Sequence, residues 1–293
     1  MAVFPPPRSL ASRLWRRVRP ARPDEGAGAG EIGDVDPATL AAEESFAFRC
    51  NLCGSLAHAS LATLGREAPS CPGCGSTVRF RAIAHLVVRE VLGRTAMLRG
   101  LPPRPGIAGI GLSDAACYAA PLARAFGYRN TWFHDEPRLD ITAIDPALRS
   151  RHDFVIASDV FEHVAPPVSR AFDNALALLK PGGSLVLTVP FSLDADTVEH
   201  YPELHDWKVE RMGGAWRVIN RTRDGREQRF DAPVFHGGPG TTLEMRLFSR
   251  DALLRELERA GFADVRIAAE PFLPFGVCWR EPWSVPIVAR RMK

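Results

Sequence analysis

The fold is decided by residues 153–190, which read DFVIASDVFEHVAPPVSRAFDNALALLKPGGSLVLTVP. Residues 154–157 and 184–189 are continuous apolar runs, a pattern typical of strands buried on both faces of a parallel sheet. Residues 168–179 between them have a helical pattern, and the Lys-Pro-Gly-Gly sequence after them is a stop signal for a helix. A strand, a helix and a second strand in this order predict a parallel α/β unit.

The alternation of strands and helices continues on both sides of this stretch. We expect strands at 106–110, 128–133, 265–268 and 285–289, and helices at 114–126 and 251–260. Such alternation predicts an α/β fold in which helices cover both faces of a parallel sheet. Residues 191–248 interrupt it, and the Asp224-Gly225 pair between two strand-like segments is typical of a β-hairpin. We expect this insertion to shape a binding site.

The composition is that of a folded globular protein. The 293 residues are 46% hydrophobic and 24% charged, which excludes wholesale disorder. No apolar run reaches the roughly 18 residues of a membrane span. The net charge of +3 combines basic segments at 1–25 and 46–95 with an acidic segment at 26–45 and a neutral body at 96–293. A neutral body argues against a wide nucleic-acid footprint.

Proline, glycine and cysteine patterns predict three parts. Residues 1–45 are expected to be a flexible tail, with weak attachment to anionic lipid or to a partner as the alternative. Residues 46–95 are expected to form a cysteine module with a linking helix at 77–92, and residues 96–293 the main domain. No apolar segment of the kind found in export signals follows the N-terminal arginines, so we expect a reducing, cytoplasmic location.

Four of the six cysteines form two closely spaced pairs. Cys50-x2-Cys53 and Cys71-x2-Cys74 are separated by 17 residues, which is the spacing of a zinc ribbon. Four thiolates complete a tetrahedron about 2.3 Å from the ion and leave no open position, so the zinc would be structural. Redox chemistry is the alternative interpretation of the quartet.

A glycine-containing turn lies between the strand predicted at 106–110 and the helix predicted at 114–126. Gly109 and Gly111 would let a ligand approach the backbone, and Asp114 lies near the start of the helix. Free N–H groups at a helix N-terminus favour binding of a polar ligand.

Polar residues also follow the next predicted strands. They are Asp135 and Glu136, then Asp140, then Ser158 and Asp159. The carboxyl ends of strands in an open α/β sheet are where ligands bind. The first two lie about 20 residues beyond the glycines, where an acid suits the hydroxyls of a ribose. These residues therefore predict a nucleoside site.

Three stretches of the sequence together resemble a known family. Residues 153–164 with their Glu-His pair, 178–190 with Lys-Pro-Gly-Gly, and Ala260-Gly-Phe262 are similar to class I S-adenosylmethionine-dependent methyltransferases. The resemblance covers roughly 106–190 and 248–291. It implies a Rossmann-like sheet of seven strands with the last one antiparallel, and S-adenosylmethionine bound over the glycine turn.

The resemblance also implies roles for single residues. Gly109 and Gly111 match the first two family glycines, Asp135 or Glu136 the acid on the ribose, and Asp140 the acid beside the adenine.

Two positions depart from the family pattern. Ile107 and Ser113 stand where the family has an acid and its third glycine, and Asp114 is expected to substitute in holding the methionine ammonium. These departures motivate a third hypothesis, in which the protein is a non-catalytic binding module that has lost the cofactor.

Two histidines are candidate bases, because methyl transfer needs a positioned nucleophile that can lose its proton. His163 follows the strand at 154–157, and its alternative is a histidine with a structural hydrogen bond. His205 belongs to a dense polar and aromatic cluster at the start of the insertion.

That cluster predicts contacts to an acceptor. Carboxylates, imidazoles and aromatic rings suit hydroxyl groups and the face of a sugar ring. The predicted contact residues are His200, Tyr201, Glu203, Asp206 and Trp207, with His236 in a neighbouring loop. The spacing His200-x4-His205 does not place both rings on one helical face, which argues against a metal between them. A solvated loop is the remaining alternative.

The leading hypothesis is an S-adenosylmethionine-dependent O- or N-methyltransferase that acts on a small-molecule or saccharide acceptor, with the acceptor site in the insertion. The second hypothesis is an RNA methyltransferase whose basic zinc ribbon grips RNA through Arg79 and Arg81.

Overall fold

The computed structural model describes residues 41–236, 238 and 242–293. Its centre is a six-stranded sheet with the order β15-β16-β6-β5-β3-β4. The strands are β3 (Arg104–Leu112), β4 (Phe126–Thr131), β5 (His152–Ser158), β6 (Leu179–Thr188), β15 (Phe262–Ile267) and β16 (Ile287–Arg291). Strands β4, β3, β5 and β6 pair in parallel, whereas β16 is antiparallel to both of its neighbours. The expected mainly parallel sheet is confirmed.

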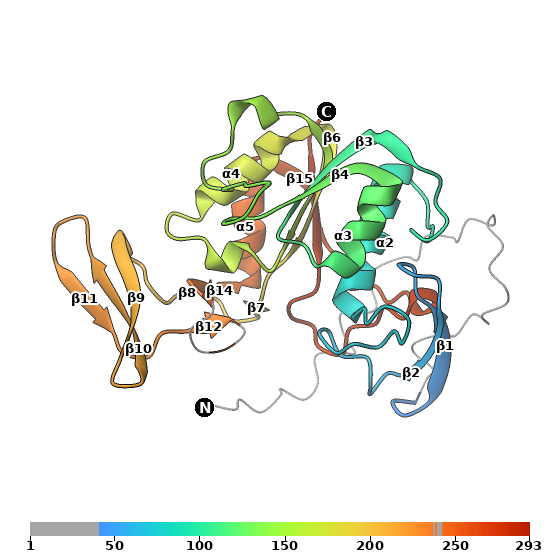
Figure 1. Ribbon diagram of the computed structural model, residues 1–293, viewed down its shortest axis with the longest axis horizontal. Helices are drawn as coiled ribbons and strands as arrows, with labels where there is room; N and C mark the ends of the chain where they lie inside the picture. Colours follow the sequence, from blue (N-terminus) through green and yellow to red (C-terminus); the bar gives the residue numbers. More distant parts are fainter. Residues whose placement is uncertain (1–40, 237, 239–241) are drawn as a thin grey trace.

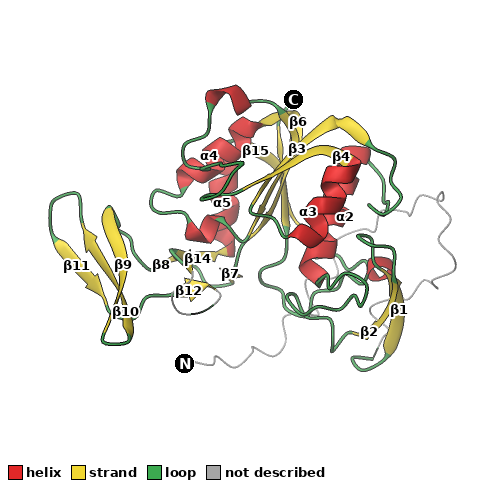
Figure 2. Cartoon of the chain, in the orientation of Figure 1, coloured by secondary structure: helices red, strands yellow, loops and turns green. Residues whose placement is uncertain are grey.

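Helices cover both faces of this sheet (Figure 2). They are α2 (Val78–Leu92) and α3 (Ala116–Ala125) on one face, and α4 (Ser169–Leu178) and α5 (Arg250–Ala260) on the other. Each face of the sheet forms its own hydrophobic core with its pair of helices. No helix in the described part of the chain is long and apolar enough to cross a membrane.

Capping residues explain where two of these helices begin and end. The Thr77 hydroxyl accepts a hydrogen bond from the Phe80 backbone N–H at the start of α2, and the helix ends at Gly93, whose φ is 66°. Ser249 caps α5 in the same way, and Gly261 ends it with a φ of 97°. Glycine adopts this left-handed conformation without the steric cost of a Cβ. These caps confirm the predicted helix boundaries to within two residues.

The described sheet has six strands rather than the seven that the resemblance implies, because the segment after β4 forms turns. Asp140 accepts from the Thr142 N–H, and Asp145 from the Ala147 N–H at the start of the 3-10 helix η1 (Pro146–Leu148). Side-chain hydrogen bonds of this kind compete with strand pairing. The segment forms only one isolated β-bridge, between Trp132 and Arg138.

The cysteine module packs on one side of the main domain (Figure 1). Strands β1 (Ser45–Arg49) and β2 (Leu56–Ser60) form an antiparallel hairpin, which packs against the 3-10 helix η3 (Leu273–Phe275). Helix α2, predicted as a linker, lies in the helical layer that covers the central sheet. The predicted flexible tail falls almost entirely on residues 1–40, which lie outside the described residues.

The insertion forms several short sheets. Its strands are β7 (Phe191–Ser192), β8 (Val198–Glu199), β9 (Asp206–Met212), β10 (Ala215–Arg221), β11 (Glu227–Phe230), β12 (Phe235–His236), β13 (Thr242–Leu243) and β14 (Arg246–Ser249). Strands β9, β10 and β11 form an antiparallel sheet that projects away from the main body (Figure 1). The hairpin predicted around Asp224-Gly225 is confirmed by the pairing of β10 with β11. Strands β7, β8, β12 and β14 lie between this sheet and the central one (Figure 1).

Candidate active site

Two strained residues mark the carboxyl ends of neighbouring strands. Ser113 follows β3 with a φ of 57°, and Asp159 follows β5 with a φ of 53°. Residues other than glycine rarely adopt a positive φ, and such strain collects at functional sites. The two strands pair in parallel, so both residues lie at the same edge of the sheet. We call this the carboxyl edge, defined by Ser113 and Asp159.

Two arginines from the cysteine module reach Asp159. Arg66 Nη2 lies 2.7 Å from Asp159 Oδ1, and Arg79 Nη1 lies 3.4 Å from Oδ2. The Thr188 hydroxyl donates to Asp159 Oδ1 at 2.8 Å, and Arg79 also donates to the Ser158 hydroxyl at 2.6 Å. Burial alone would raise the pKa of Asp159, but the hydrogen bonds and charges of the arginines outweigh it and lower that pKa. The cysteine module and the carboxyl edge are therefore electrostatically joined.

Asp114 is buried beneath the same edge. Its carboxylate accepts hydrogen bonds from the hydroxyl groups of Tyr118 on α3 and Tyr128 on β4. Burial raises the pKa of Asp114 to about 7, against the opposing effect of these two donors and of Arg79. The residue predicted to hold the methionine ammonium thus binds two tyrosines in this structure.

The two predicted cofactor glycines lie inside β3. A Cβ on Gly109 would meet the Phe154 ring at 2.0 Å, and one on Gly111 would meet Asp114 Oδ2 at 2.0 Å and the Tyr128 hydroxyl at 2.1 Å. The absence of a side chain at these positions lets the buried strand pack against its neighbours. Their predicted contact with the cofactor stays a prediction.

Replacement of Gly111 with Ala is expected to destabilise the fold by about 1–3 kcal/mol, the usual cost of overpacking a core. The added methyl group would displace the Asp114 carboxylate from its tyrosines. Urea unfolding measures the loss. Gly106→Ala is the matched control, because a Cβ there meets no atom within 4 Å. Equal stability of the two variants would contradict the expectation.

The predicted adenosyl acids lie beyond β4. Asp135 and Glu136 are exposed in the loop after the strand, and the Glu136 carboxylate accepts from the Arg138 backbone N–H. Asp140 is half-buried and accepts from the backbone and the hydroxyl of Thr142. They follow the strand next to β3, so the sheet order puts them beside the carboxyl edge.

The four cysteine sulfurs converge at one point. Cys50 Sγ lies 3.7 Å from Cys74 Sγ, and Cys53 Sγ lies 3.6 Å from Cys71 Sγ. All four sulfurs lie within 4.8 Å of one another. A tetrahedron whose metal–sulfur distance is about 2.3 Å has edges of about 3.8 Å. The quartet therefore has the spacing that a tetrahedral metal centre needs.

Arg81, proposed above to grip RNA, is fully buried beside this quartet. Its guanidinium donates to the carbonyl oxygens of Phe275 and Gly276, both at 2.8 Å, and to Ser70 and Ser76. It therefore holds the module against the C-terminal segment.

Arg79 is mostly buried as well. Besides its contacts at the carboxyl edge, its guanidinium pairs with Glu67 at 2.6 Å. Both arginines on which the RNA hypothesis rested thus have internal partners, which argues against their use in gripping RNA.

A second polar cluster lies where the insertion meets the end of β5. Glu162 and His163 belong to the 3-10 helix η2 (Phe161–His163), and His236 belongs to β12. Glu162 Oε1 lies 3.8 Å from His163 Nε2 and 3.7 Å from His236 Nδ1. The Met245 backbone N–H donates to the Glu162 carbonyl oxygen at 2.7 Å, which fixes the insertion to η2. We call Glu162, His163 and His236 the Glu-His cluster.

Burial shifts the pKa values of Glu162 and His163 in opposite directions. It raises the pKa of Glu162 well above its ordinary value, and the nearby negative charge of Asp159 adds to the rise. It lowers the pKa of His163, which favours the neutral imidazole. His163 Nδ1 lies 2.7 Å from the Leu243 carbonyl oxygen and donates to it, so Nε2 carries the lone pair that faces Glu162.

The sequence of the main domain matches a known family. Residues 104–267, more than half of the chain, match the family model described as a methyltransferase domain. The chain belongs to this family. With its mainly parallel sheet, it is a class I S-adenosylmethionine-dependent methyltransferase. No curated protein matches the sequence.

Two solved structures illustrate what the methyltransferase is similar to. The 1,6-didemethyltoxoflavin-N1-methyltransferase of Burkholderia thailandensis, with 1,6-didemethyltoxoflavin and S-adenosylhomocysteine bound, is 15% identical, covers 72% of this chain and 79% of its own, and has a TM-score of 0.39. The sugar N-methyltransferase KedS8 from Streptoalloteichus sp is 18% identical, covers 73% and 88%, and has a TM-score of 0.40.

The methyltransferase's predicted acceptor residues are separated by the fold. His200 Nε2 lies 3.3 Å from Glu244 Oε1, and Glu244 Oε2 lies 4.0 Å from His236 Nδ1, so Glu244 links His200 to the Glu-His cluster, of which His236 is a member. Tyr201 is buried, accepts from the Val234 N–H and packs edge-on against a phenylalanine ring. It therefore supports the insertion and does not offer its ring for stacking.

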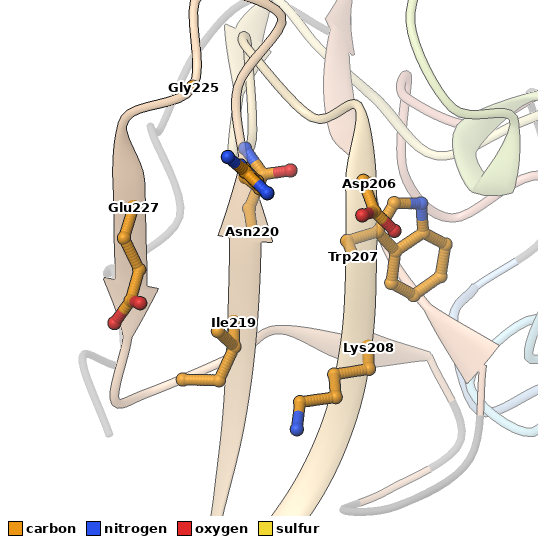
Figure 3. A pocket seen from close by; sticks show the side chains of 8 residues that line it. Asp206, Trp207, Lys208, Ile219, Asn220, Gly225 and Glu227 are labelled. Atoms are coloured by element: carbon orange, nitrogen blue, oxygen red, sulfur yellow. The ribbon is translucent and has the colours of Figure 1, made fainter.

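The remaining predicted residues lie on the projecting sheet or directly before its first strand. Glu203 pairs with Arg226 at 2.7 Å, and His205 is exposed at the start of β9. Asp206 and Trp207 border an open pocket of about 430 Å³ on this sheet (Figure 3). The projecting sheet extends away from the main body (Figure 1). The residues that are clustered in the sequence thus lie in two separate parts of the structure.

Sequence reasoning missed Glu162, Glu244 and Arg66 as site residues of the methyltransferase. Glu162 stands next to His163, so its adjacency to a candidate base was a usable signal. The other two are single charged residues outside any recognisable motif, and only the folded chain brings them to the Glu-His cluster and to Asp159. No pattern of spacing in the sequence predicts those contacts.

Proposed function

We propose that this enzyme transfers a methyl group from S-adenosylmethionine to a hydroxyl or amine of a small-molecule or saccharide acceptor. The observation that carries the proposal is the junction of η2 with the insertion. There Glu162 and His163 directly follow β5, and His236, His200 and Glu244 come from the insertion. Imidazoles and carboxylates at such a junction suit the hydrogen-bonding groups of a small polar acceptor.

The reaction needs little covalent participation by the protein. An acceptor lone pair attacks the methyl carbon, the methyl–sulfur bond breaks, its electrons stay on sulfur, and the acceptor loses a proton. The protein supplies position and a proton acceptor. His163 is suited to that role because burial keeps its imidazole neutral and Nε2 carries the lone pair.

S-adenosylmethionine would bind at the carboxyl edge. Asp135 or Glu136 would accept hydrogen bonds from the ribose, and Asp140 would lie on the adenine side. The strained backbone at Ser113 and Asp159 and the exposed carboxylates after β4 support this placement.

We infer that the cysteine quartet holds structural zinc. The sulfur spacing supports it, and so does Arg81, a fully buried cation for which no carboxylate in the described residues forms an ion pair. Zinc with four thiolates carries a net charge of −2, which the adjacent guanidinium would partly offset.

Calorimetric titration with S-adenosylmethionine and S-adenosylhomocysteine tests the proposal. We expect one-to-one binding in the micromolar range that is weakened at least tenfold by Asp135→Ala and Asp140→Ala. Asp173→Ala is the matched control, because this exposed acid lies on α4 and pairs with Arg259. Absence of heat with either ligand would overturn the proposal and favour the non-catalytic binding module.

A further inference from the structure

Glu162 is a buried carboxyl group that makes no side-chain hydrogen bond in the described structure. Its side chain is fully buried, and neither carboxylate oxygen has a hydrogen-bond partner among the described residues. An ionised carboxylate in this position is strongly unfavourable without a cation. The two imidazole nitrogens that face Glu162 Oε1 lie 3.7 and 3.8 Å away, which is too long for a hydrogen bond but leaves room for a shared ion.

The two imidazole nitrogens face Glu162 from different elements. His163 comes from η2 and His236 from β12, and their rings lie 5.1 Å apart at an angle of 70°. The ligand atoms of the three residues all lie within 4.8 Å of one another. Three ligands of a tetrahedral ion with metal–ligand distances of about 2.0–2.2 Å are about 3.3–3.6 Å apart. The distances from Glu162 Oε1 to the two imidazole nitrogens, 3.7 and 3.8 Å, are close to this spacing.

The orientation of His163 is that of a metal ligand. Its Nδ1–H donates to the Leu243 carbonyl oxygen at 2.7 Å, which leaves the Nε2 lone pair directed at the cluster. Histidines that bind metals usually donate their other ring N–H to a carbonyl or carboxylate in this manner. The backbone bond from Met245 to the Glu162 carbonyl holds the insertion in place beside it.

We propose that Glu162, His163 and His236 bind a divalent transition-metal ion, separate from the ion at the four cysteines. Two imidazoles and one carboxylate are the ligand set of open zinc sites and of other first-row divalent ions. The ion would give the carboxylate oxygens of Glu162 the partner that they lack among the described residues. Three protein ligands leave at least one coordination position of the ion open. The four cysteines, in contrast, leave no position open.

The role of this ion, unlike its binding, rests on the proposed function. An acceptor hydroxyl bound at the open position would lose its proton more readily. The proton would pass to Glu244, whose Oε2 lies 4.0 Å from His236 Nδ1. The acceptor oxygen would then form its bond to the methyl carbon as the methyl–sulfur bond breaks. With the ion bound, the Nε2 lone pair of His163 is used on the metal, so Glu244 replaces His163 as the proton acceptor; without the ion, His163 keeps that role.

Metal stoichiometry of the full chain tests the site. After expression with zinc and dialysis, plasma mass spectrometry should find two zinc ions per chain in the wild type and one in Glu162→Gln, His163→Ala and His236→Ala. The control His134→Ala, an exposed imidazole outside the cluster, should keep two. Circular dichroism confirms that each variant is folded, and Glu162→Gln preserves the shape of the side chain.

Cobalt covers the case in which the open site loses zinc during dialysis. Added Co²⁺ should give an absorption spectrum without thiolate charge-transfer bands, which saturates at one ion per chain in the wild type and is absent in Glu162→Gln. No saturable binding in the wild type, or equal binding in the wild type and all three variants, would overturn the inference. Binding of S-adenosylhomocysteine by the same samples tests the proposed function separately.

Discussion

Replacement of Cys74 with Ser is expected to destabilise the whole protein and not only its cysteine module. Zinc bound to four thiolates contributes on the order of 10 kcal/mol to small zinc domains, and the loss of one ligand removes much of this. Cys50 and Cys71 also lie in the same hydrophobic core as α2, α3 and one face of the sheet. Differential scanning calorimetry should therefore show one transition at a temperature at least 10 °C lower.

A strong chelator should have the same effect on the wild type. Cys278→Ser is the matched control, because Cys278 is half-buried but lies outside the quartet. Two separate transitions, with the larger one unmoved, would show that the module folds independently of the sheet. That outcome would contradict the shared core.

Asp114 is expected to make stability depend on pH in the direction opposite to most carboxylates. Burial raises the pKa of Asp114 from its ordinary 3.8 to about 7, so the folded chain binds a proton that the unfolded chain releases. Its contribution to stability is fully present below about pH 4 and is lost as the pH rises through 7. At about 1.4 kcal/mol per pKa unit, the loss between pH 5 and pH 8 is about 3 kcal/mol.

Asp114→Asn removes this titration, because an amide resembles the protonated carboxyl group between Tyr118 and Tyr128. Urea unfolding of both proteins at several pH values isolates the contribution of Asp114, since all other titrating groups cancel in the difference. Between pH 5 and pH 8, the free energy of unfolding of the variant should rise by about 3 kcal/mol relative to that of the wild type. Parallel curves would show that the tyrosine hydroxyls keep the carboxylate ionised.

The fold was predictable because its signals are local. Continuous apolar runs at 154–157 and 184–189 mark β5 and β6, and glycines mark the ends of α2 and α5. That the described part of the chain forms six strands in this sheet and not seven was not predictable from the resemblance. It depends on side-chain hydrogen bonds at Asp140 and Asp145 that favour turns over strand pairing.

The site was predictable only in part, because its contacts join distant segments. The sequence identified His163 and Asp159 correctly as residues at the end of β5. It did not predict that Arg66 would pair with Asp159 across 93 positions. The sequence also placed Tyr201 and Trp207 in one site with the histidines, because they are neighbours along the chain. In the structure Tyr201 is buried, and Trp207 lies on β9 of the projecting sheet.

The hydrogen bonds of Arg81 also constrain the order in which the chain becomes structured during synthesis. Small zinc modules often fold as soon as they leave the ribosome, before the rest of the chain has been made. Here the guanidinium finds its acceptors at Phe275 and Gly276, 194 and 195 positions further along. Until those residues emerge, a nascent chain would have to bury an arginine with half of its partners missing. The cysteine module is thus translated before the sheet but is among the last parts of the enzyme to reach its final packing.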